Sequence, residues 1–279
     1  YGKAFNAHYQ AQGFHPLMVF DGMTGDCLKV ELRAGNVYTS RNIVSFIGPL
    51  LSHYQKRFPS SYRIVRGDSG FAHKELYKLC ETLNTNYVIR LKANATLYRL
   101  AKEVMDVFLE ECSLQYSQQF YGEFEYQAKS WDRPRRVIVQ VRRKAGELIP
   151  DYLFLVTNME TRPEMVISLY AKRGTMENYI KECKNGFRMD KVSHKHWMTN
   201  VNRIQLMVLA YNLINGFRRL TLPHEFSKMQ IETLRIKLIK IAAKRVKQSR
   251  RIMFKLCSHH PYKEVFHHCL KTIQAIQLE

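Results

Sequence analysis

Residues 62–71 read Tyr-Arg-Ile-Val-Arg-Gly-Asp-Ser-Gly-Phe, a short run around Ile64 and Val65 that stops at a glycine and an aspartate. The run Tyr62–Arg66 predicts a strand, and a helix is expected over about 72–82. Glycine on both sides of Asp68 lets the chain turn sharply and lets a ligand approach closely. A carboxylate in this position is often a metal ligand or catalytic group. The alternative is an aspartate that caps the next helix, and this segment alone leaves both open.

The segments around this strand complete an alternating pattern of elements. A hairpin and a helix are expected upstream, and one more strand downstream: 16–20, 27–32, 41–57 and 87–91. The order strand, strand, helix, strand, helix, strand predicts a mixed sheet with helices packed on it, which is an α/β fold.

After residue 97 the sequence pattern predicts three further regions. Alternating apolar and polar residues predict a β-rich insertion with basic edges, and helices then return. Among them, an apolar helix over 200–217 is expected to be buried, and another helix is expected over 227–256. The chain is thus expected to divide into a first core part, the insertion, core helices and a basic helical C-terminal region: 1–97, 98–160, 161–220 and 221–279.

The charge balance of the chain points to a polyanionic partner. Lys and Arg number 44 against 24 Asp and Glu, a net charge of +20 over 279 residues. Such an excess most often indicates nucleic acid. An anionic membrane surface is the weaker option, because no lone amphipathic anchor helix, membrane-spanning run or signal-peptide pattern is found. Six scattered cysteines without a CxxC pair predict buried, reduced thiols in a cytosolic protein.

A second informative stretch, 170–184, reads Tyr-Ala-Lys-Arg-Gly-Thr-Met-Glu-Asn-Tyr-Ile-Lys-Glu-Cys-Lys. Its second part predicts a helix on which Glu177, Lys181 and Lys184 share one face. Glu177 and Lys184 lie two turns apart, roughly 10 Å along the axis. That spacing suits a carboxylate on a metal ion and an ammonium on a DNA phosphate further along the strand. A solvated helix with a Glu–Lys pair is the alternative, and spacing alone does not separate the two.

Asp68 and Glu177 together have a specific chemical use. Hydrolysis or transfer of a phosphodiester uses two divalent cations about 4 Å apart. Carboxylates are suitable ligands for Mg²⁺. Arg173 and Lys184 would then counter the phosphate charge, the first with a planar fork and the second as a point charge.

The row Tyr170-x2-Arg173-x3-Glu177-x6-Lys184 is similar to the Y-R-E-K signature of DDE transposases from bacterial insertion sequences. Segment 66–71 looks like the second-aspartate segment of that family. Stretches that resemble one of its subgroups occur at 14–17, 32–36 and 209–213. The match covers nearly the whole chain, and the motifs stand in the expected order.

This resemblance implies an RNase H-like core with a β-rich insertion between the second Asp and the Glu. It implies that Asp68 and Glu177 are catalytic ligands of a two-metal site for Mg²⁺ or Mn²⁺, while Tyr170, Arg173, Lys181 and Lys184 contact double-stranded DNA. The implied reaction is hydrolysis at the transposon ends, then attack of the freed 3′-hydroxyl on target DNA. A homodimer in the bacterial cytoplasm, at the nucleoid, would carry it out.

The family needs three carboxylates, and its first Asp lies on a strand that precedes the hairpin. The chain starts at Tyr1, in a segment that resembles the part of the family beyond this strand, so we expect a truncated transposase with an incomplete metal site. The sheet is expected to be impaired, because two strands would lose a hydrogen-bonding neighbour. Asp21, at the hairpin turn, is the only nearby substitute. A non-catalytic DNA-binding fragment and a stand-alone nuclease remain alternatives.

Two further features are open to more than one interpretation. Trp131 lies in the basic insertion; in related transposases an insert aromatic stacks on a flipped base, and the alternative is packing on the small sheet. The expected helix over 235–255 carries nine Lys or Arg and no acid, which favours contact with DNA phosphates over a merely solvated face. The Cys and His residues over 257–269 fit no standard zinc module.

Overall fold

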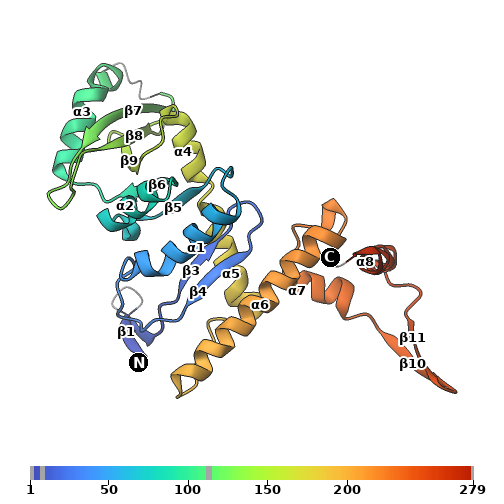
Figure 1. Ribbon diagram of the computed structural model, residues 1–279. Coiled ribbons are helices and arrows are strands. Elements are labelled where there is room, and N and C mark those ends of the chain that lie inside the picture. Colours follow the sequence, from blue (N-terminus) through green and yellow to red (C-terminus); the bar gives the residue numbers. More distant parts are fainter. Residues whose placement is uncertain (1–2, 7–9, 111–114, 278–279) are drawn as a thin grey trace. The chain divides into compact units, whose positions relative to one another are not determined.

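The computed structural model describes residues 3–6, 10–110 and 115–277. The chain forms two compact units (Figure 1). The first consists of residues 36–174, and the second of residues 1–35 together with 175–279. Each unit has its own core, and each is described by itself below.

The unit of residues 36–174 is built on one five-stranded mixed sheet (Figure 1). Its strands, in spatial order, are β5 (Ile64–Gly67), β6 (Asn86–Leu91), β9 (Asp151–Thr157), β8 (Arg135–Arg143) and β7 (Gln118–Tyr126). β5 and β6 run parallel, and the other neighbours run antiparallel. The mixed α/β fold expected from the sequence is confirmed. The strands of the predicted insertion are present, but they extend the sheet of β5 and β6 and do not form a separate one.

Helices flank this sheet. They are α1 (Ile43–Arg57), α2 (Lys74–Thr82), α3 (Ala95–Glu110) and α4 (Pro163–Ala171). On α4, Val166 and Ile167 pack against the buried Val88 of β6 and Ile138 of β8. This apolar stripe at helical spacing fixes the end of α4 close to the sheet.

An ion-pair network joins the end of α2 to β8. Glu81 receives hydrogen bonds from Arg135 at 3.0 and 3.2 Å and from the Tyr87 hydroxyl at 3.0 Å. The Arg135 guanidinium is buried and lies over the rings of Tyr77 and Trp131, 5.2 and 5.6 Å from their centroids. Burial opposes ionisation of Glu81, but the hydrogen bonds from Arg135 and Tyr87 outweigh it, so the pKa of Glu81 is lowered.

The other unit begins with small strands and ends in helices. Its elements are β1 (Ala4–Asn6), β2 (Ala11–Gly13), β3 (Leu17–Phe20), β4 (Cys27–Glu31), α5 (Gly174–Phe187, whose first residue belongs to the other unit), α6 (Trp197–Thr221), α7 (Ile231–Leu234), a π-helical turn (Arg235–Ile239), β10 (Ala243–Gln248), β11 (Arg251–Leu256) and α8 (Lys263–Ala275). The predicted hairpin is confirmed as the antiparallel pair β3–β4.

The β3–β4 hairpin is held on α6 by side chains from segment 209–213 and by Asn215. Asn212 accepts a hydrogen bond from the Cys27 amide at 2.8 Å and donates one to the Cys27 carbonyl at 2.9 Å. The carbonyl of Gly25 accepts bonds from the Tyr211 hydroxyl at 2.9 Å and the Asn215 amide at 3.0 Å. Gly25 has φ +76°, a left-handed conformation that favours glycine. This stretch therefore has a structural role.

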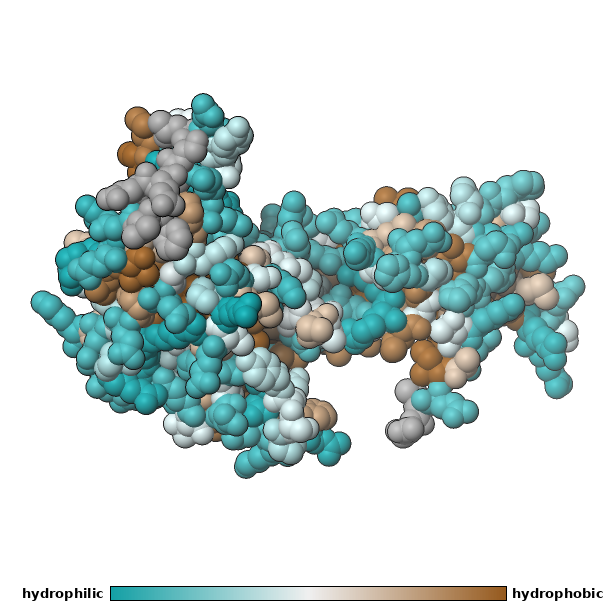
Figure 2. All heavy atoms as spheres, turned by 90° about the horizontal axis from the view of Figure 1, so that it is seen from above, coloured by the Kyte–Doolittle hydropathy of each residue, from teal (hydrophilic) through white to brown (hydrophobic). Residues whose placement is uncertain are grey.

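The apolar helix expected to be buried, α6, is buried on one face only. Ile204, Val208 and Tyr211 face the hairpin, whereas Leu206 and Leu213 are each 65% exposed. The expectation was wrong because apolar residues surround this helix, while the β3–β4 hairpin and, near the end of α6, the cluster of Ile231, Leu234 and Cys269 cover only part of its surface. Hydrophobic residues likewise reach the surface in several separate places in Figure 2, within a mostly hydrophilic face.

The single helix predicted over 227–256 is also wrong. Helical structure ends at Ile239, and β10 and β11 form a two-stranded antiparallel hairpin with a turn at Ser249 and Arg250. One helix would place Lys240, Lys244 and Lys247 in a row on one face, where like charges repel. The turn instead begins with Ser249 at φ 47°, which suits a two-residue hairpin loop.

The thiols largely follow the sequence expectation. Four cysteines are free and buried: Cys27, Cys80, Cys183 and Cys269. Burial raises the pKa of Cys27 and Cys80 to about 12 each, so both are protonated thiols at neutral pH. Cys257 is free but exposed, and Cys112 lies outside the described residues. No helix in the described part of the chain is both long and apolar enough to cross a membrane.

Candidate functional site

Asp68 lies directly after β5 and opens a short 3₁₀ turn, Ser69–Phe71. One carboxylate oxygen, Oδ1, accepts a hydrogen bond from the Gly70 amide at 2.9 Å. Asp68 therefore caps the 3₁₀ turn, whereas the helix that it was expected to cap, α2, has His73 at its N-cap. This capping occupies one carboxylate oxygen of Asp68, and the second oxygen points elsewhere.

The glycines on either side of Asp68 provide room and not backbone freedom. Neither has positive φ. A Cβ on Gly70 would lie 3.0 Å from Asp68 Oδ1 and 3.0 Å from Thr39 Cβ, and a Cβ on Gly67 would lie 3.0 Å from Phe71 Cβ. Glycine was expected here for a sharp turn and for close approach of a ligand; the structure gives a steric reason for it instead, and the approach of a ligand stays a prediction.

Arg173 lies beside the second oxygen of Asp68. Its Nη2 is 3.5 Å from Asp68 Oδ2, and the two side chains are 22% and 43% exposed. The position follows from α4, because Arg66 at the end of β5 donates a hydrogen bond to the Leu169 carbonyl at 2.9 Å. The Arg173 amide then donates to the Tyr170 carbonyl at 2.8 Å. Two predicted site residues, Asp68 and Arg173, are thus brought together, and the Asp68 side of their ion pair is open to solvent.

Tyr170, near the end of α4, packs into the core of the same unit. Its side chain is buried among the α4 and sheet residues that include Val166, Ile167 and Leu155. The structure therefore shows a packing role for Tyr170 at the end of α4. The DNA contact expected of Tyr170 stays a prediction.

Glu177, Lys181 and Lys184 lie on α5 at the helical spacing that was predicted, and all three are exposed. Glu177 is in the first turn of the helix, where the helix dipole stabilises a negative charge. The opposite face of α5 packs into the core through Cys183 and Tyr179. One face of α5 therefore presents a carboxylate followed by two cations.

A second glutamate on α5 has a different environment. Glu182 is paired with the buried Arg218 of α6, and its Oε1 accepts a hydrogen bond from the Ile231 amide at 2.9 Å. Its side chain is only 13% exposed. Glu182 therefore joins α5, α6 and α7, and Glu177 is the glutamate of α5 that faces solvent.

The chemistry of these donors fits a hard divalent cation, although they are few. Carboxylate oxygens are the ligands that Mg²⁺ prefers, and Asp68 and Glu177 are exposed enough to reach one. They belong to different units, and their shared site stays a prediction. No group of three His, Cys, Asp or Glu side chains able to hold a metal ion occurs within residues 3–6, 10–110 and 115–277.

Asp21, the substitute considered for a third carboxylate, holds the β3–β4 turn. Its Oδ1 accepts hydrogen bonds from the backbone amides of Met23 at 2.7 Å and Thr24 at 3.3 Å. This is a local turn interaction typical of aspartate. The structure therefore gives Asp21 a folding role and adds no support for a metal role.

Trp131 is buried, with 8% of its surface exposed. Its ring meets Tyr77 and Tyr126 edge to face, each at 5.4 Å between centroids. The structure therefore places Trp131 where the packing alternative expected it. Base stacking by Trp131 stays a prediction, and it would require the ring to leave these contacts.

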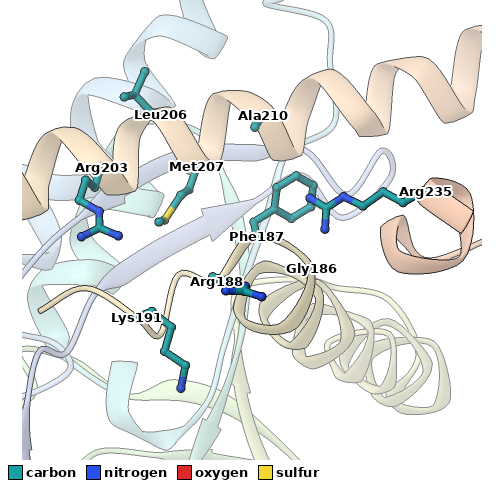
Figure 3. Close-up of a pocket in the computed structure, with 9 residues that line it drawn as sticks. All are labelled: Gly186, Phe187, Arg188, Lys191, Arg203, Leu206, Met207, Ala210 and Arg235. Atoms are coloured by element: carbon teal, nitrogen blue, oxygen red, sulfur yellow. The ribbon is translucent and has the colours of Figure 1, made fainter. Parts of the chain in front are cut away.

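A cationic groove in the second unit was not predicted from the sequence. It has a volume of about 510 Å³ and an apolar floor that includes Phe187 and Met207 (Figure 3). Its four cations come from the segment after α5, from α6 and from the π-helical turn: Arg188 and Lys191, Arg203, and Arg235. Lys191 and Arg235 pair with neighbouring acids, whereas Arg188 and Arg203 form no ion pair with a described residue. No local motif signals this groove, because its cations converge from separate segments.

The five-stranded mixed sheet flanked by helices agrees with the RNase H-like fold of DDE-type proteins. The catalytic roles of the aspartate beside Arg173 and of the Glu-Lys row on α5 stay predictions. The family model for the transposase DDE domain, group 1, matches residues 1–278, and the chain belongs to this family. No protein with curated function matches the chain. The transposase resemblance noted in the sequence is confirmed at the level of the family.

Proposed function

We propose that this protein catalyses metal-dependent DNA cleavage and strand transfer in the transposition of a bacterial insertion sequence. Asp68 and Glu177 are the proposed catalytic metal ligands. The observation that carries the proposal is the Asp68–Arg173 pair at 3.5 Å, formed by the strand end and the first half of the Tyr-Arg-Glu-Lys row. It occurs in a chain that belongs to a DDE transposase family.

The residues of the chain have distinct roles in this proposal. The hydrogen bond from the Gly70 amide orients the Asp68 carboxylate, and Arg173 lies beside its second oxygen. Mg²⁺ or Mn²⁺, when bound, activates the attacking oxygen and stabilises the leaving oxygen. Arg173 binds the reacting phosphate with its fork, and Lys181 and Lys184 hold phosphates further along the strand.

Double-stranded DNA, as transposon ends and as target, is the proposed partner. The net charge of +20 and the cationic groove favour a polyanion over any neutral ligand. We further propose that the protein acts as a homodimer in its DNA complex, in the bacterial cytoplasm at the nucleoid.

A non-catalytic DNA-binding role is the second candidate. It is favoured by the donor set, because the chemistry of the family uses three carboxylates and the described residues hold no such group. This candidate keeps the DNA contacts of Arg173, Lys181 and Lys184 and loses the reaction.

The experiment compares the wild-type chain with Asp68→Asn and Glu177→Gln. Joining of pre-cut DNA ends to a plasmid is measured in Mg²⁺ and in Mn²⁺, and Mn²⁺ binding is measured by electron paramagnetic resonance. The proposal expects joined products that both substitutions abolish. Joining that survives both substitutions overturns it. DNA binding without joining in any variant identifies the non-catalytic candidate. Nicked plasmid without joined product indicates a nuclease.

A further inference from the structure

The β10–β11 hairpin is a separate two-stranded ribbon. Its register runs without a shift from the pair Ala243–Leu256 to the pair Gln248–Arg251. Six residues per strand give a length of about 20 Å. Within the described residues the two strands pair only with each other (Figure 1).

The ribbon is strongly cationic. Residues 243–256 contain no acid and six cations, all exposed: Lys244, Arg245, Lys247, Arg250, Arg251 and Lys255. None of the six forms an ion pair with a residue that the structure describes. Buried arginines elsewhere, such as Arg135 and Arg218, are paired with glutamates. Six uncompensated charges on one ribbon repel one another, and a polyanion relieves that repulsion.

Apolar side chains stand between these cations. Partners across an antiparallel pair share a face, so Arg245 faces Phe254 and Lys247 faces Ile252 on one side of the ribbon. Phe254 is 65% exposed, Ile252 55% and, on the other side, Met253 46%. Both faces therefore combine cations with uncovered apolar groups.

This combination matches the major groove of duplex DNA. The groove is about 12 Å wide and admits a two-stranded ribbon, and it presents thymine methyl groups together with base edges. Phosphates line both sides of it.

A second copy of the ribbon is a poor binding partner, because six positive charges would then face six more. We propose that the β10–β11 hairpin binds duplex DNA in the major groove, with its cations on phosphates and base edges and Phe254 and Ile252 against the bases. The proposal rests on the proposed DNA-processing function and names an element that holds the duplex.

The test uses the full chain and a fluorescein-labelled 30-base-pair duplex, with binding followed by anisotropy over a range of salt concentrations. The hairpin variant is Arg245→Gln with Lys247→Gln and Arg251→Gln. The matched control is Lys56→Gln with Arg57→Gln and Lys102→Gln, three cations of the other unit. Circular dichroism and thermal unfolding confirm that both variants are folded.

We expect the slope of log affinity against log salt to fall by about 2–3 in the hairpin variant, because each lost phosphate contact removes about 0.9. If the affinities converge near 1 M salt, the affinity near 0.1 M salt then falls roughly 100- to 1,000-fold, and the control changes it less than about threefold. Methylation of guanine N7, which lies in the major groove, should weaken binding of the wild type and not of the hairpin variant.

Equal losses in the hairpin variant and the control overturn the proposal, as does insensitivity of the wild type to N7 methylation. A variant that loses binding to phosphatidylserine vesicles but keeps its affinity for the duplex also overturns it, because the hairpin is then a lipid-binding element. Phe254→Ala is the second variant, and it should lower affinity several-fold with no change in salt slope. Failure of DNA joining, with the hairpin effects intact, counts against the proposed catalytic function alone.

Discussion

Two carboxylate–arginine pairs in the unit of residues 36–174 have different surroundings in the structure. Glu81 is bonded by Arg135, Arg133 and Tyr87, and its partner Arg135 has a side chain only 3% exposed. Asp68 has one arginine at 3.5 Å, and its side chain is 43% exposed. Glu81 therefore has no capacity left for a ligand, whereas Asp68 does.

This contrast shows that pairing with an arginine does not by itself mark a structural carboxylate. The buried pair is held in place by stacking of Arg135 on Tyr77 and Trp131, so its loss leaves a charge in the core. The exposed pair contributes little to stability, because solvent screens it. The same distinction separates Glu182 from Glu177 on α5. The two exposed carboxylates are the proposed catalytic ones.

The largest expected effect is on activity. Asp68→Asn and Glu177→Gln should each lower the rate of DNA joining by more than about 10³-fold, equivalent to roughly 4 kcal/mol of barrier. The melting temperature should stay within about 2 °C, since exposed substitutions change stability by about 0.5 kcal/mol or less. Joining rates and thermal unfolding are measured on the same preparations. A large drop in melting temperature would show that these carboxylates are structural and remove the contrast.

Glu81→Gln should show the opposite behaviour. It removes the charge that neutralises Arg135, and breaking a buried pair of this kind costs about 3 kcal/mol, at the low end of the usual range because Asp132 also contacts Arg135. Urea unfolding measures this loss. Glu75→Gln on the same helix is the matched control, because the Glu75 side chain is 48% exposed. Activity per folded molecule should be unchanged, and a specific loss of activity would contradict the structural role.

The acid dependence of stability should also separate the two carboxylates. The pKa of Glu81 is lowered in the folded protein, and its unfolded pKa is about 4.3. The folded state therefore binds fewer protons in mild acid, so the stabilisation is complete above about pH 4.3 and is lost as pH falls through the folded pKa. Urea unfolding over a series of pH values from neutral to mildly acidic should show a flatter curve for Glu81→Gln than for wild type. Parallel curves would mean that Glu81 is not the group responsible.

A structural feature of this protein could be predicted from the sequence where a short-range sequence pattern encodes it. The strand before Asp68, the hairpin at Asp21 and the helix bearing Glu177 all follow short-range patterns, and all three are found where expected. The Glu81–Arg135 network joins residues 54 positions apart, and the cationic groove joins segments from Gly186 to Arg235. No periodicity encodes such meetings.

In the C-terminal region the local sequence pattern itself is ambiguous. Residues 235–255 carry charge at a density that fits both helix and strand, and the turn at Ser249 lacks the glycine that usually signals a hairpin. DNA contact was expected from the positive charge of this region, and it stays a prediction for the hairpin. The helix was expected from the secondary-structure pattern, and that expectation was wrong.

A smaller effect is expected at Arg173. Arg173→Gln should reduce joining roughly 10-fold, because a charge-assisted contact with phosphate is lost. Stability should change by less than about 1 kcal/mol, as for other solvent-exposed pairs. Arg173→Lys is the informative companion, since it keeps the charge and loses the fork. If Lys restores full activity, Arg173 supplies only charge; if Arg173→Gln unfolds the protein, the pair with Asp68 is structural after all.

The smallest expected effect comes from crowding Asp68 without touching its charge. Gly70→Ala introduces a Cβ 3.0 Å from Asp68 Oδ1 and 3.0 Å from Thr39 Cβ, so both neighbours must shift by a few tenths of an ångström. Because Asp68 is exposed and can rotate, the stability cost should be about 1 kcal/mol or less. Rotation moves the carboxylate away from Arg173, so joining should fall several-fold while DNA affinity is kept. Thr39→Ala in the same chain removes the Cγ2 atom that also crowds this position and should restore part of the rate. No recovery would place the effect on the Asp68 oxygen alone, and an unchanged rate in Gly70→Ala would show that the orientation of this carboxylate does not limit the reaction.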